Sequence, residues 1–421
     1  MFLIYQFIVL LLIIISPIII IIRIFKKKEH KKRFIEKFSI ISKKREKGNL
    51  IWFHGSSVGE ILSIIPIVEK LEKNKLVKKI LITSSTLSSS QILTKFNFKK
   101  TIHQFFPIDS TYFANKFLNF WQPSIAIFIE SEIWPSMFLS INKRSIPLLL
   151  MNARITQKTF KRWEKIKFFS NSVFSKINFA YPQNRETYQY LKKLQVPKIN
   201  FIGNLKFSES KLDKKILINK KFYKQFKNRK VWCASSTHAD EELDCAKVHI
   251  NLKRKYKNLL TIIIPRHVHR TGEIIKKIND LGLNIIQRSS NKKIAKNTDI
   301  YLIDTYGETK KFYKISKTVF LGGSLINHGG QNPIEPARLQ STIIHGIHTH
   351  NFKEVYKLLD DNKISYKANN TFELTKLVDK SISDLKNKKN KYLKIKKLGN
   401  TILNKTMKEI NTLIKHEVKK T

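Results

Sequence analysis

The chain has 421 residues, and 42% of them are hydrophobic, which is enough apolar material for the cores of two to three domains. Its two cysteines, Cys233 and Cys245, exclude a disulfide framework and a cysteine-based metal site, and they fit a reducing compartment. The formal net charge of +49 would suit nucleic acid or an anionic membrane. However, the 80 basic residues are mostly lysines dispersed along the chain, as AT-rich genomes produce, and this argues against a nucleic-acid-binding face.

The first 22 residues contain no charged side chain. Phe2–Ile22 would form a helix of roughly 30 Å, long enough to cross a bilayer, and Pro17 would kink it or mark its last turn. A cleaved signal peptide is the competing interpretation, but no basic residue precedes the apolar run and no small-residue cleavage site follows it. The basic flank Arg23–Arg33 should remain cytoplasmic and attract anionic lipids. We therefore predict a single membrane anchor over residues 1–25, with the rest of the chain in the cytoplasm.

From about residue 49, short apolar runs alternate with amphipathic stretches in two series. This alternation predicts two doubly wound α/β domains with parallel sheets. The strands predicted for the first domain are Leu50–Phe53, Ile80–Thr83, Ile125–Ile129, Leu148–Met151 and Phe179–Tyr181. Those predicted for the second are Val231–Ala234, Leu259–Ile264, Asn284–Ile286, Ile300–Ile303, Val319–Leu321 and Thr342–Ile344.

A lysine-rich stretch without motifs separates the two series, so we place a linker at residues 211–230. The domains would then cover residues 26–210 and 231–388, with a cleft between them. Residues 389–421 are predicted to form a basic helical segment. Its possible apolar face consists of Leu393, Leu398, Ile402, Met407, Ile410 and Leu413.

The stretch Ile51–Glu60, with the sequence IWFHGSSVGE, joins a predicted strand to a predicted helix. Glu60 would lie in the first helical turn at the carboxyl end of the strand, where open α/β folds bind ligands. The helix N-terminus favours a carboxylate, so we expect Glu60 to be ionised at neutral pH and able to accept a proton. The simpler alternative is a surface glutamate that complements the helix dipole. Gly55–Gly59 also fits the G-x-S-x-G elbow of α/β-hydrolases, but the strands and the oxyanion-hole loop that such a hydrolase needs do not precede it.

Other polar clusters follow the predicted strands. They are Glu130–Glu132, Asn152–Arg154, Gly203–Phe207, Ser235–His238, Pro265–His267, Gly322–Ser324 and His328–Pro336. Each cluster by itself could be an ordinary turn. Together they would place carboxylates, a lysine and an arginine around one cleft.

The motifs IWFHGSSVGE, FIESEIWP, MNARI, GNLKF, ASSTH, IPRH, TYGE and LGGSLINHGGQNPIEPA resemble, in order and spacing, those of the bacterial 3-deoxy-D-manno-octulosonic acid (Kdo) transferases. The resemblance extends from the N-terminal anchor to about Asn351. It implies a GT-B glycosyltransferase, with an N-terminal acceptor domain and a C-terminal CMP-Kdo-binding domain, both Rossmann-like. It further implies inverting, metal-independent transfer of Kdo from CMP-Kdo to the lipid A precursor lipid IVA at the cytoplasmic face of the inner membrane, without a cofactor. The alternative is another GT-B nucleotide-sugar transferase with a different acceptor.

By this resemblance, Glu60 is the general base, and Glu130 and Lys206 stabilise the transition state. The residues implied to bind CMP are Arg266, His267, Tyr306, Gly307, Glu308, Asn332, Pro333, Ile334 and Glu335. The alternatives are helix N-terminal acids for Glu130 and Glu132, a solvated lysine for Lys206, and a turn residue for His267.

The chemistry of these residues is consistent with such a role. Arg266, Lys206 and the backbone N–H groups near Gly322–Gly323 or Gly329–Gly330 could hold the phosphate and the Kdo carboxylate. A helix beginning near Pro333 would add further N–H groups, and Glu335 could accept hydrogen bonds from the ribose hydroxyls. Three positions depart from the family pattern. Gly55 stands where a bulkier residue is often found. Gln331 stands where histidine is usual and cannot become cationic, and His350 stands where an aromatic residue is often found.

Overall fold

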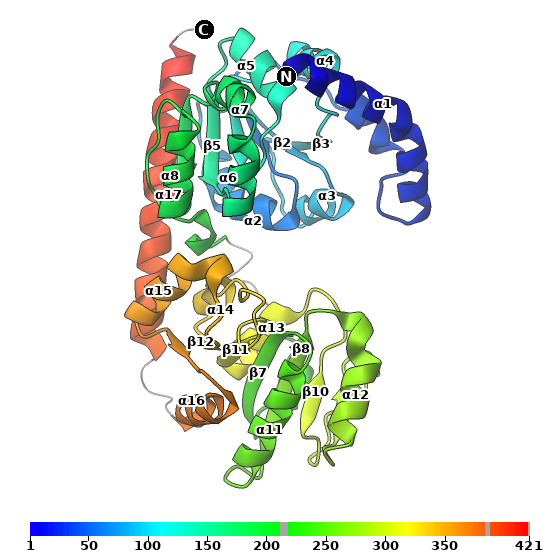
Figure 1. The fold of residues 1–421 in the computed structure, drawn as a ribbon, viewed down its shortest axis with the longest axis vertical. Coiled ribbons are helices and arrows are strands. Elements are labelled where there is room, and N and C mark those ends of the chain that lie inside the picture. The colour runs from blue at the N-terminus through cyan, green and yellow to red at the C-terminus, as the bar shows by residue number, and fades with distance from the viewer. Residues whose placement is uncertain (211–217, 384–387, 420–421) are drawn as a thin grey trace. The chain divides into compact units, whose positions relative to one another are not determined.

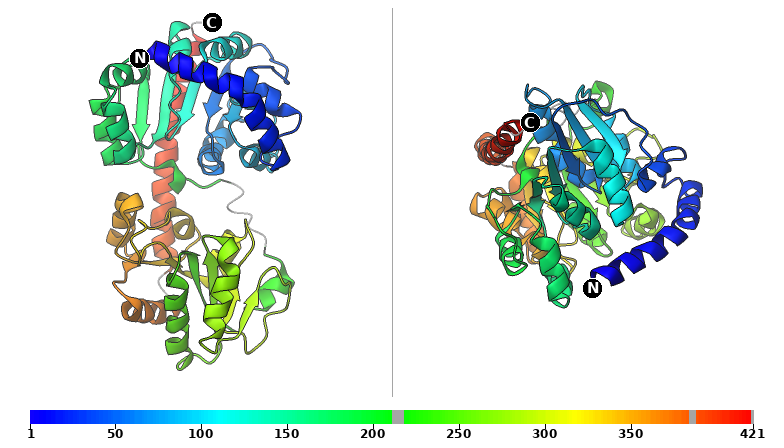
Figure 2. Two further views of the ribbon diagram at one scale, coloured as in Figure 1. Left: turned by 45° about the vertical axis from the view of Figure 1, so that its right-hand side comes forward. Right: turned by 90° about the horizontal axis from the view of Figure 1, so that it is seen from above.

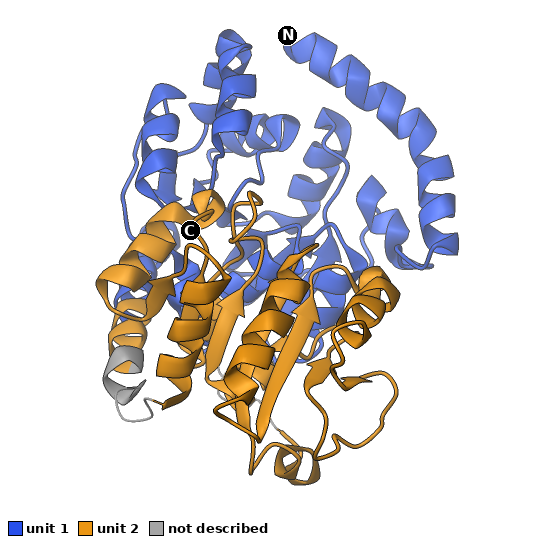
Figure 3. Ribbon diagram, turned by 60° about the horizontal axis from the view of Figure 1, so that its bottom comes forward, with its two compact units in different colours: residues 1–210, 400–421 blue, residues 211–399 orange. Residues whose placement is uncertain are grey.

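The computed structural model of the chain describes residues 1–210, 218–383 and 388–419. The chain forms two compact units: unit 1 consists of residues 1–210 and 400–421, and unit 2 of residues 211–399 (Figure 3). Part of the predicted linker, residues 211–217, lies outside the described residues, and its described part contains the short helix α10 (Lys220–Lys224). The last 22 residues of the chain belong to unit 1, whereas the sequence analysis set residues 389–421 apart as a separate segment.

Unit 1 contains a six-stranded parallel sheet in the order β3-β2-β1-β4-β5-β6. Figure 1 labels β2, β3 and β5 of this sheet. The strands are β1 (Leu50–His54), β2 (Lys79–Ser84), β3 (Thr101–Phe105), β4 (Ile125–Ile129), β5 (Leu148–Ala153) and β6 (Phe179–Pro182). The helices are α2 (Val58–Leu71), α3 (Leu87–Leu93), α4 (Thr111–Trp121), α5 (Pro135–Lys143), α6 (Gln157–Glu164), α7 (Lys167–Phe174) and α8 (Arg185–Lys193). Every residue of β1, β4 and β5 is buried, which explains their continuous apolar runs. The five predicted strands are confirmed, whereas the edge strand β3, which contains the polar residues Thr101, His103 and Gln104, was not predicted.

Unit 2 contains a seven-stranded parallel sheet in the order β13-β12-β11-β7-β8-β10-β9. The strands are β7 (Lys230–Thr237), β8 (Leu259–Pro265), β9 (Ile285–Gln287), β10 (Ile300–Leu302), β11 (Thr318–Leu321), β12 (Thr342–His345) and β13 (Ser365–Lys367). The helices include α11 (Glu241–Lys253), α12 (Thr271–Asn279), α13 (Thr309–Ser316), α14 (Ile334–Arg338), α15 (Lys353–Asp361) and α16 (Thr371–Ser383). The six predicted strands are confirmed, whereas the three-residue edge strand β13 was not predicted.

The C-terminal helix α17 (Lys388–Val418) confirms the predicted helical segment, and its residues from Asn400 onward belong to unit 1. The predicted apolar face is only partly right. Leu393 is 57% exposed, while the buried apolar residues of the helix are Ile395, Ile402, Leu403, Met407, Ile410 and Ile414. Side-chain contacts tie this part of the helix to unit 1, for example Tyr181 Oη, which donates to Glu409 at 3.0 Å.

The N-terminal helix α1 (Phe2–Phe25) lies along the outside of unit 1 (Figure 2). It is long and apolar enough to cross a membrane, and most of its side chains are exposed. The helix continues through Pro17 and is bent (Figure 3), as an interior proline requires. Near its start, Tyr5 Oη donates to Asp109 at 2.6 Å and Gln6 Nε2 donates to Ser136 at 2.7 Å. The first turns of α1 are therefore attached to unit 1 by polar contacts.

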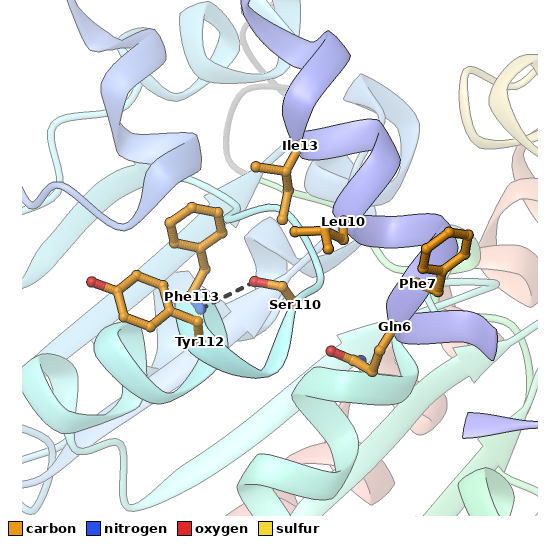
Figure 4. Close-up of a pocket in the computed structure, with 7 residues that line it drawn as sticks. All are labelled: Gln6, Phe7, Leu10, Ile13, Ser110, Tyr112 and Phe113. Atoms are coloured by element: carbon orange, nitrogen blue, oxygen red, sulfur yellow. Dashed lines mark hydrogen bonds between the residues drawn. The ribbon is translucent and has the colours of Figure 1, made fainter. Parts of the chain in front are cut away.

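A pocket of about 460 Å³ lies between α1 and the beginning of α4 (Figure 4). Its lining residues are Gln6, Phe7, Leu10, Ile13, Ser110, Tyr112 and Phe113. Most of these side chains are apolar, so the pocket continues the apolar surface of α1.

Candidate active site

Glu60 lies in the first turn of α2, directly after β1, as the sequence predicted. Ser57 is the N-cap residue, and its hydroxyl accepts the Glu60 N–H at 3.2 Å while donating to Glu60 Oε1 at 2.8 Å. The backbone N–H of Ser56 donates to Glu60 Oε2 at 2.7 Å. A Cβ atom at Gly55 would stand 3.1 Å from Glu60 Cβ, so glycine gives the carboxylate side chain room against the turn. This capping box holds the carboxyl group in one place.

The protonation state of Glu60 differs from the expectation. Burial, followed by the negative charges of Glu132 and Glu130, raises the pKa of Glu60 to about 7 against the opposing hydrogen bonds from Ser57 and Ser56. The helix N-terminus by itself would keep Glu60 ionised at neutral pH, which was the expectation from the sequence. In the folded chain these longer-range effects outweigh the dipole, so Glu60 is about half protonated near pH 7. A carboxyl group with a pKa near the working pH is well matched to general-base catalysis.

Glu130 follows β4 and lies beside the predicted lysine. Lys206 Nζ is 2.5 Å from Glu130 Oε1, and Lys206 belongs to the short 3-10 helix η2 (Leu205–Phe207). Asn152, at the end of β5, accepts the Leu205 N–H at 2.9 Å and so ties η2 to the sheet. Glu130 and Asn152 both have positive φ, at 56° and 52°, a strained backbone conformation that is frequent at functional sites. The structure thus brings Glu130 and Lys206 together from segments far apart in the sequence.

Glu132 and His54 form a second polar cluster that the sequence analysis gave no role. Glu132 Oε2 accepts hydrogen bonds from Ser56 Oγ at 2.8 Å, Trp134 Nε1 at 2.9 Å and His54 Nε2 at 3.0 Å. Burial acts to raise the pKa of Glu132, but the contacts with His54, Ser56 and Trp134 outweigh it and lower this pKa. Glu132 therefore stays ionised and repels negative charge on Glu60. Two sequence features could have pointed to this cluster: Glu132 is the second acid of the ESEIW motif, and His54 is the last residue of β1.

In unit 1 the strand order reverses between β1 and β4, so these turns lie at the switch point of the sheet. Open α/β sheets bind their ligands outside the carboxyl ends of the strands at this point. A carboxyl group near half protonation, an ionised carboxylate and an ion-paired lysine are suited to move a proton and to stabilise developing charge.

In unit 2 the glycine turn after β11 is held by a buried acid. Glu241 accepts the backbone N–H groups of four residues, including Gly323 at 2.6 Å and Ser324 at 3.1 Å. The N–H of Gly322 donates to Ser235 O at 2.9 Å, and the N–H of Gly330 donates to Gly323 O at 2.7 Å. Protein acceptors therefore already use the N–H groups of Gly322, Gly323 and Gly330, and these contacts do not support a phosphate role for those three groups.

Arg266 and His267 follow β8, and both side chains are exposed. The Arg266 N–H donates to Thr237 O at 2.9 Å, which brings the ends of β7 and β8 together. The His267 ring lies 5.7 Å from the His238 ring, measured between centroids. Cationic and imidazole groups therefore gather at the carboxyl end of this sheet.

The Tyr306–Glu308 segment directly precedes α13, and Glu308 is the N-cap residue of that helix. Tyr306 is 82% exposed and Gly307 has a φ of 81°. Glu308 contacts Arg288 at 3.0 Å and Lys311 at 3.1 Å. Burial acts to raise the pKa of Glu308, but hydrogen bonds from Arg288, Thr305 and Lys311 lower it to about 2.

The Asn332–Glu335 segment begins α14, which has five residues. Asn332 Oδ1 accepts the N–H of Ile334 at 3.1 Å, so the first N–H group of this helix is already bonded. Pro333 and Ile334 are buried, and Glu335 lies 3.3 Å from Lys310. A phosphate role for the N–H groups at this helix start is not supported by these contacts.

Comparison with known proteins identifies the family. Residues 32–209 match the protein family described as 3-Deoxy-D-manno-octulosonic-acid transferase (kdotransferase). The chain is 31% identical over 358 residues to the 3-deoxy-D-manno-octulosonic acid transferase of Haemophilus influenzae, covering 84% of this chain and 83% of the relative. It is 32% identical over 375 residues to the probable mitochondrial 3-deoxy-D-manno-octulosonic acid transferase of Arabidopsis thaliana, covering 85% and 82%.

Among solved structures, a putative UDP-N-acetylglucosamine 2-epimerase from Listeria monocytogenes superposes with a TM-score of 0.62 at 12% identity, over 89% of this chain and 98% of that one. At this identity the likeness shows the fold alone, that of two parallel-sheet α/β domains of the GT-B kind. Because the sequence relatives are matched over more than two thirds of their length, we conclude that this chain is a GT-B glycosyltransferase that belongs to the Kdo transferase family.

Proposed function

We propose that the protein transfers Kdo from CMP-Kdo to lipid IVA in lipopolysaccharide synthesis, with inversion and without a metal ion, at the cytoplasmic face of the inner membrane. Membership of the Kdo transferase family supports the sugar that is transferred. The observation that carries the mechanism is Glu60, a carboxyl group with a pKa of about 7 at the switch point of unit 1. Such a group is half deprotonated near neutral pH and can accept the proton of a sugar hydroxyl.

In the proposed reaction the acceptor hydroxyl attacks the anomeric carbon of Kdo as Glu60 takes its proton. The bond between that carbon and the phosphate oxygen breaks, and CMP leaves with the electron pair. One base acting on the face opposite the leaving group gives a single displacement with inversion. The carboxylate of Glu130 would stabilise the positive charge that develops on the sugar. The ammonium group of Lys206, 2.5 Å from Glu130, would offset the negative charges of Glu130 and of the Kdo carboxylate.

Transfer without a metal ion requires that protein groups stabilise the departing phosphate of CMP. A phosphate that departs needs cationic or hydrogen-bonding partners, which a divalent metal or protein side chains can supply. The exposed Arg266 at the carboxyl end of β8 is suited to this role. The sequence contains no Asp-x-Asp pair, and among the described residues no three His, Cys, Asp or Glu side chains come together as candidate metal ligands.

The membrane location is supported by α1 and the segment that follows it. Lys26, Lys27, Lys28, Lys31 and Lys32 follow the apolar helix and are all exposed. Exposed lysines beside an apolar helix favour anionic headgroups by electrostatic attraction. An acceptor that lies in the membrane would then be held near the anchored enzyme.

The test uses the full-length protein in membranes, with CMP-Kdo, lipid IVA and EDTA. Glu60→Gln should lower the rate of Kdo transfer by at least ~100-fold, as expected for loss of a general base. Glu69→Gln, on the same helix α2, is the matched control and should retain the wild-type rate. If the wild type acts only when a divalent metal is restored, metal independence is wrong. If it binds CMP and transfers nothing to lipid IVA, the acceptor is a different one.

A further inference from the structure

His238 is a buried histidine at the carboxyl end of β7 to which the mechanism above gives no role. It is 7% exposed, and its Nε2 atom has no hydrogen-bond partner in the part of the chain that the structure describes. The adjacent Thr237 Oγ1 is also buried without a partner among the described residues. Native proteins pair nearly all buried polar atoms, so two neighbouring exceptions indicate that a bound group completes them.

The location of His238 is the position where this fold binds ligands. In unit 2 the strand order reverses between β7 and β11, and His238 directly follows β7. The turn after β11 lies against it, because a Cβ atom at Gly323 would stand 3.3 Å from His238 Nε2. The ring nitrogen therefore lies at the switch point of the sheet, against a turn with no side chain at Gly323.

The surroundings of His238 lack an available negative charge. The rings of His328 and His267 lie 4.1 and 5.7 Å away, and Arg266 and Arg270 are nearby cations. Among the described residues, the acid that accepts a hydrogen bond from the His238 backbone is Glu241, and its carboxylate already accepts four backbone N–H groups. Burial first, and then His328, His267, Arg266 and Arg270, lower the pKa of His238 to about 4. The imidazole is therefore neutral near pH 7 while the site is empty, and the group that suits this position is an anion.

We propose that His238 Nε2 donates a hydrogen bond to the phosphate of the CMP moiety, and that the imidazole takes up a proton from solvent when the phosphate binds. This inference rests on the proposed CMP-Kdo donor. A phosphate oxygen supplies the missing acceptor, and its negative charge favours the imidazolium form. The bond then becomes charge-assisted and opposes the negative charge that CMP carries away as it leaves. The backbone N–H groups of Gly322 and Gly323 cannot take this role, since they are bonded within the protein.

The test is calorimetric titration of the full-length, detergent-solubilised protein with CMP and with cytidine, at about pH 6. Each titration is repeated in two buffers with different ionisation enthalpies, which gives the number of protons taken up per ligand bound. His238→Gln keeps a hydrogen-bonding amide but cannot become cationic. His269→Gln, an exposed histidine of the neighbouring turn, is the matched control.

We expect the wild type to take up more protons per CMP than His238→Gln, by up to about one, because the variant lacks the titrating group. CMP affinity should fall by roughly 10- to 100-fold in His238→Gln, the range for a hydrogen bond to a charged group, while cytidine affinity stays the same. Retained cytidine binding also shows that the variant is folded. His269→Gln should behave as the wild type.

Three results would overturn the inference: unchanged CMP affinity in His238→Gln, an equal loss for CMP and cytidine, or proton uptake that His269→Gln reduces as much as His238→Gln. The first would show that the phosphate does not reach His238. Failure of the proposed function has a different signature, because the wild type itself would then bind neither CMP nor cytidine.

Discussion

The pKa of Glu60 predicts how the transferase responds to pH and to a change at Glu132. The general base that we propose, Glu60, would work only when deprotonated, so the rate should rise with pH through about 7 and level off above it. With a pKa near 7, about 9% of Glu60 is deprotonated at pH 6 and about 91% at pH 8, so the rate should differ about tenfold between these pH values. A glutamate at its ordinary pKa of 4.5 would give almost no difference.

The informative substitution is Glu132→Gln. It removes the negative charge that raises the pKa of Glu60 most, while an amide oxygen can still accept one of the three hydrogen bonds made to Glu132 Oε2. The acid limb of the pH profile should therefore move below 7. It should not reach 4.5, because burial is the largest cause of the shift and remains.

The assay is kcat/KM for CMP release from CMP-Kdo, measured between pH 5 and 9 in buffers of constant ionic strength. The acceptor's phosphates also titrate in this range. The wild type and Glu132→Gln share the same acceptor, so a difference between their profiles belongs to the protein. A wild-type rate that is flat between pH 6 and 8, or a limb that moves upward in Glu132→Gln, would refute the reasoning.

Three further predictions concern other contacts. Lys206→Met removes the ammonium group that lies 2.5 Å from Glu130 and should lower kcat by roughly 100- to 1,000-fold. Lys206→Arg keeps the positive charge and should restore part of the rate. An equal loss of kcat in both variants would show that the positive charge is not the important property of Lys206. Glu241→Ala leaves four backbone N–H groups without their acceptor, at a cost of about 1–3 kcal/mol each. The free energy of unfolding measured in urea should therefore fall by several kcal/mol. It should fall less in Glu241→Gln, which keeps one acceptor oxygen. Gly322→Ala would place a Cβ atom 2.5 Å from a backbone oxygen and should lower Tm. Gly272→Ala in α12, where a Cβ atom meets nothing within 4 Å, should stabilise the protein by about 0.5–1 kcal/mol. A Gly322→Ala variant more stable than Gly272→Ala would contradict the packing at the end of β11.

Features that depend on local sequence were predicted well. Strands buried on both faces are continuous apolar runs, so β1, β4 and β8 could be recognised from their residues. The capping box that places Glu60 spans four residues, Ser57 to Glu60, and its hydrogen bonds lie within them. The apolar helix α1 likewise follows from composition over one continuous segment.

Two of the four edge strands, β3 and β13, were not predicted, whereas the edge strands β6 and β9 were. β3 contains the polar residues Thr101, His103 and Gln104, and β13 consists of Ser365, Tyr366 and Lys367, so neither forms a continuous apolar run. The apolar face of α17 was also misjudged at Leu393. A helical pattern shows which residues share a face, but not which part of the helix meets a partner.

The two parallel sheets, the apolar N-terminal helix and the residue types at the strand ends all follow from local sequence patterns. The behaviour of those residues depends on contacts made in the folded chain. The pKa of Glu60 depends on burial and on the negative charge of Glu132, 72 residues further along the chain. The glycine turn after β11 is bonded to Glu241, 82 residues before Gly323. Local patterns specify helices and strands because their bonds are short-range, whereas protonation and hydrogen-bond availability depend on groups that folding brings together.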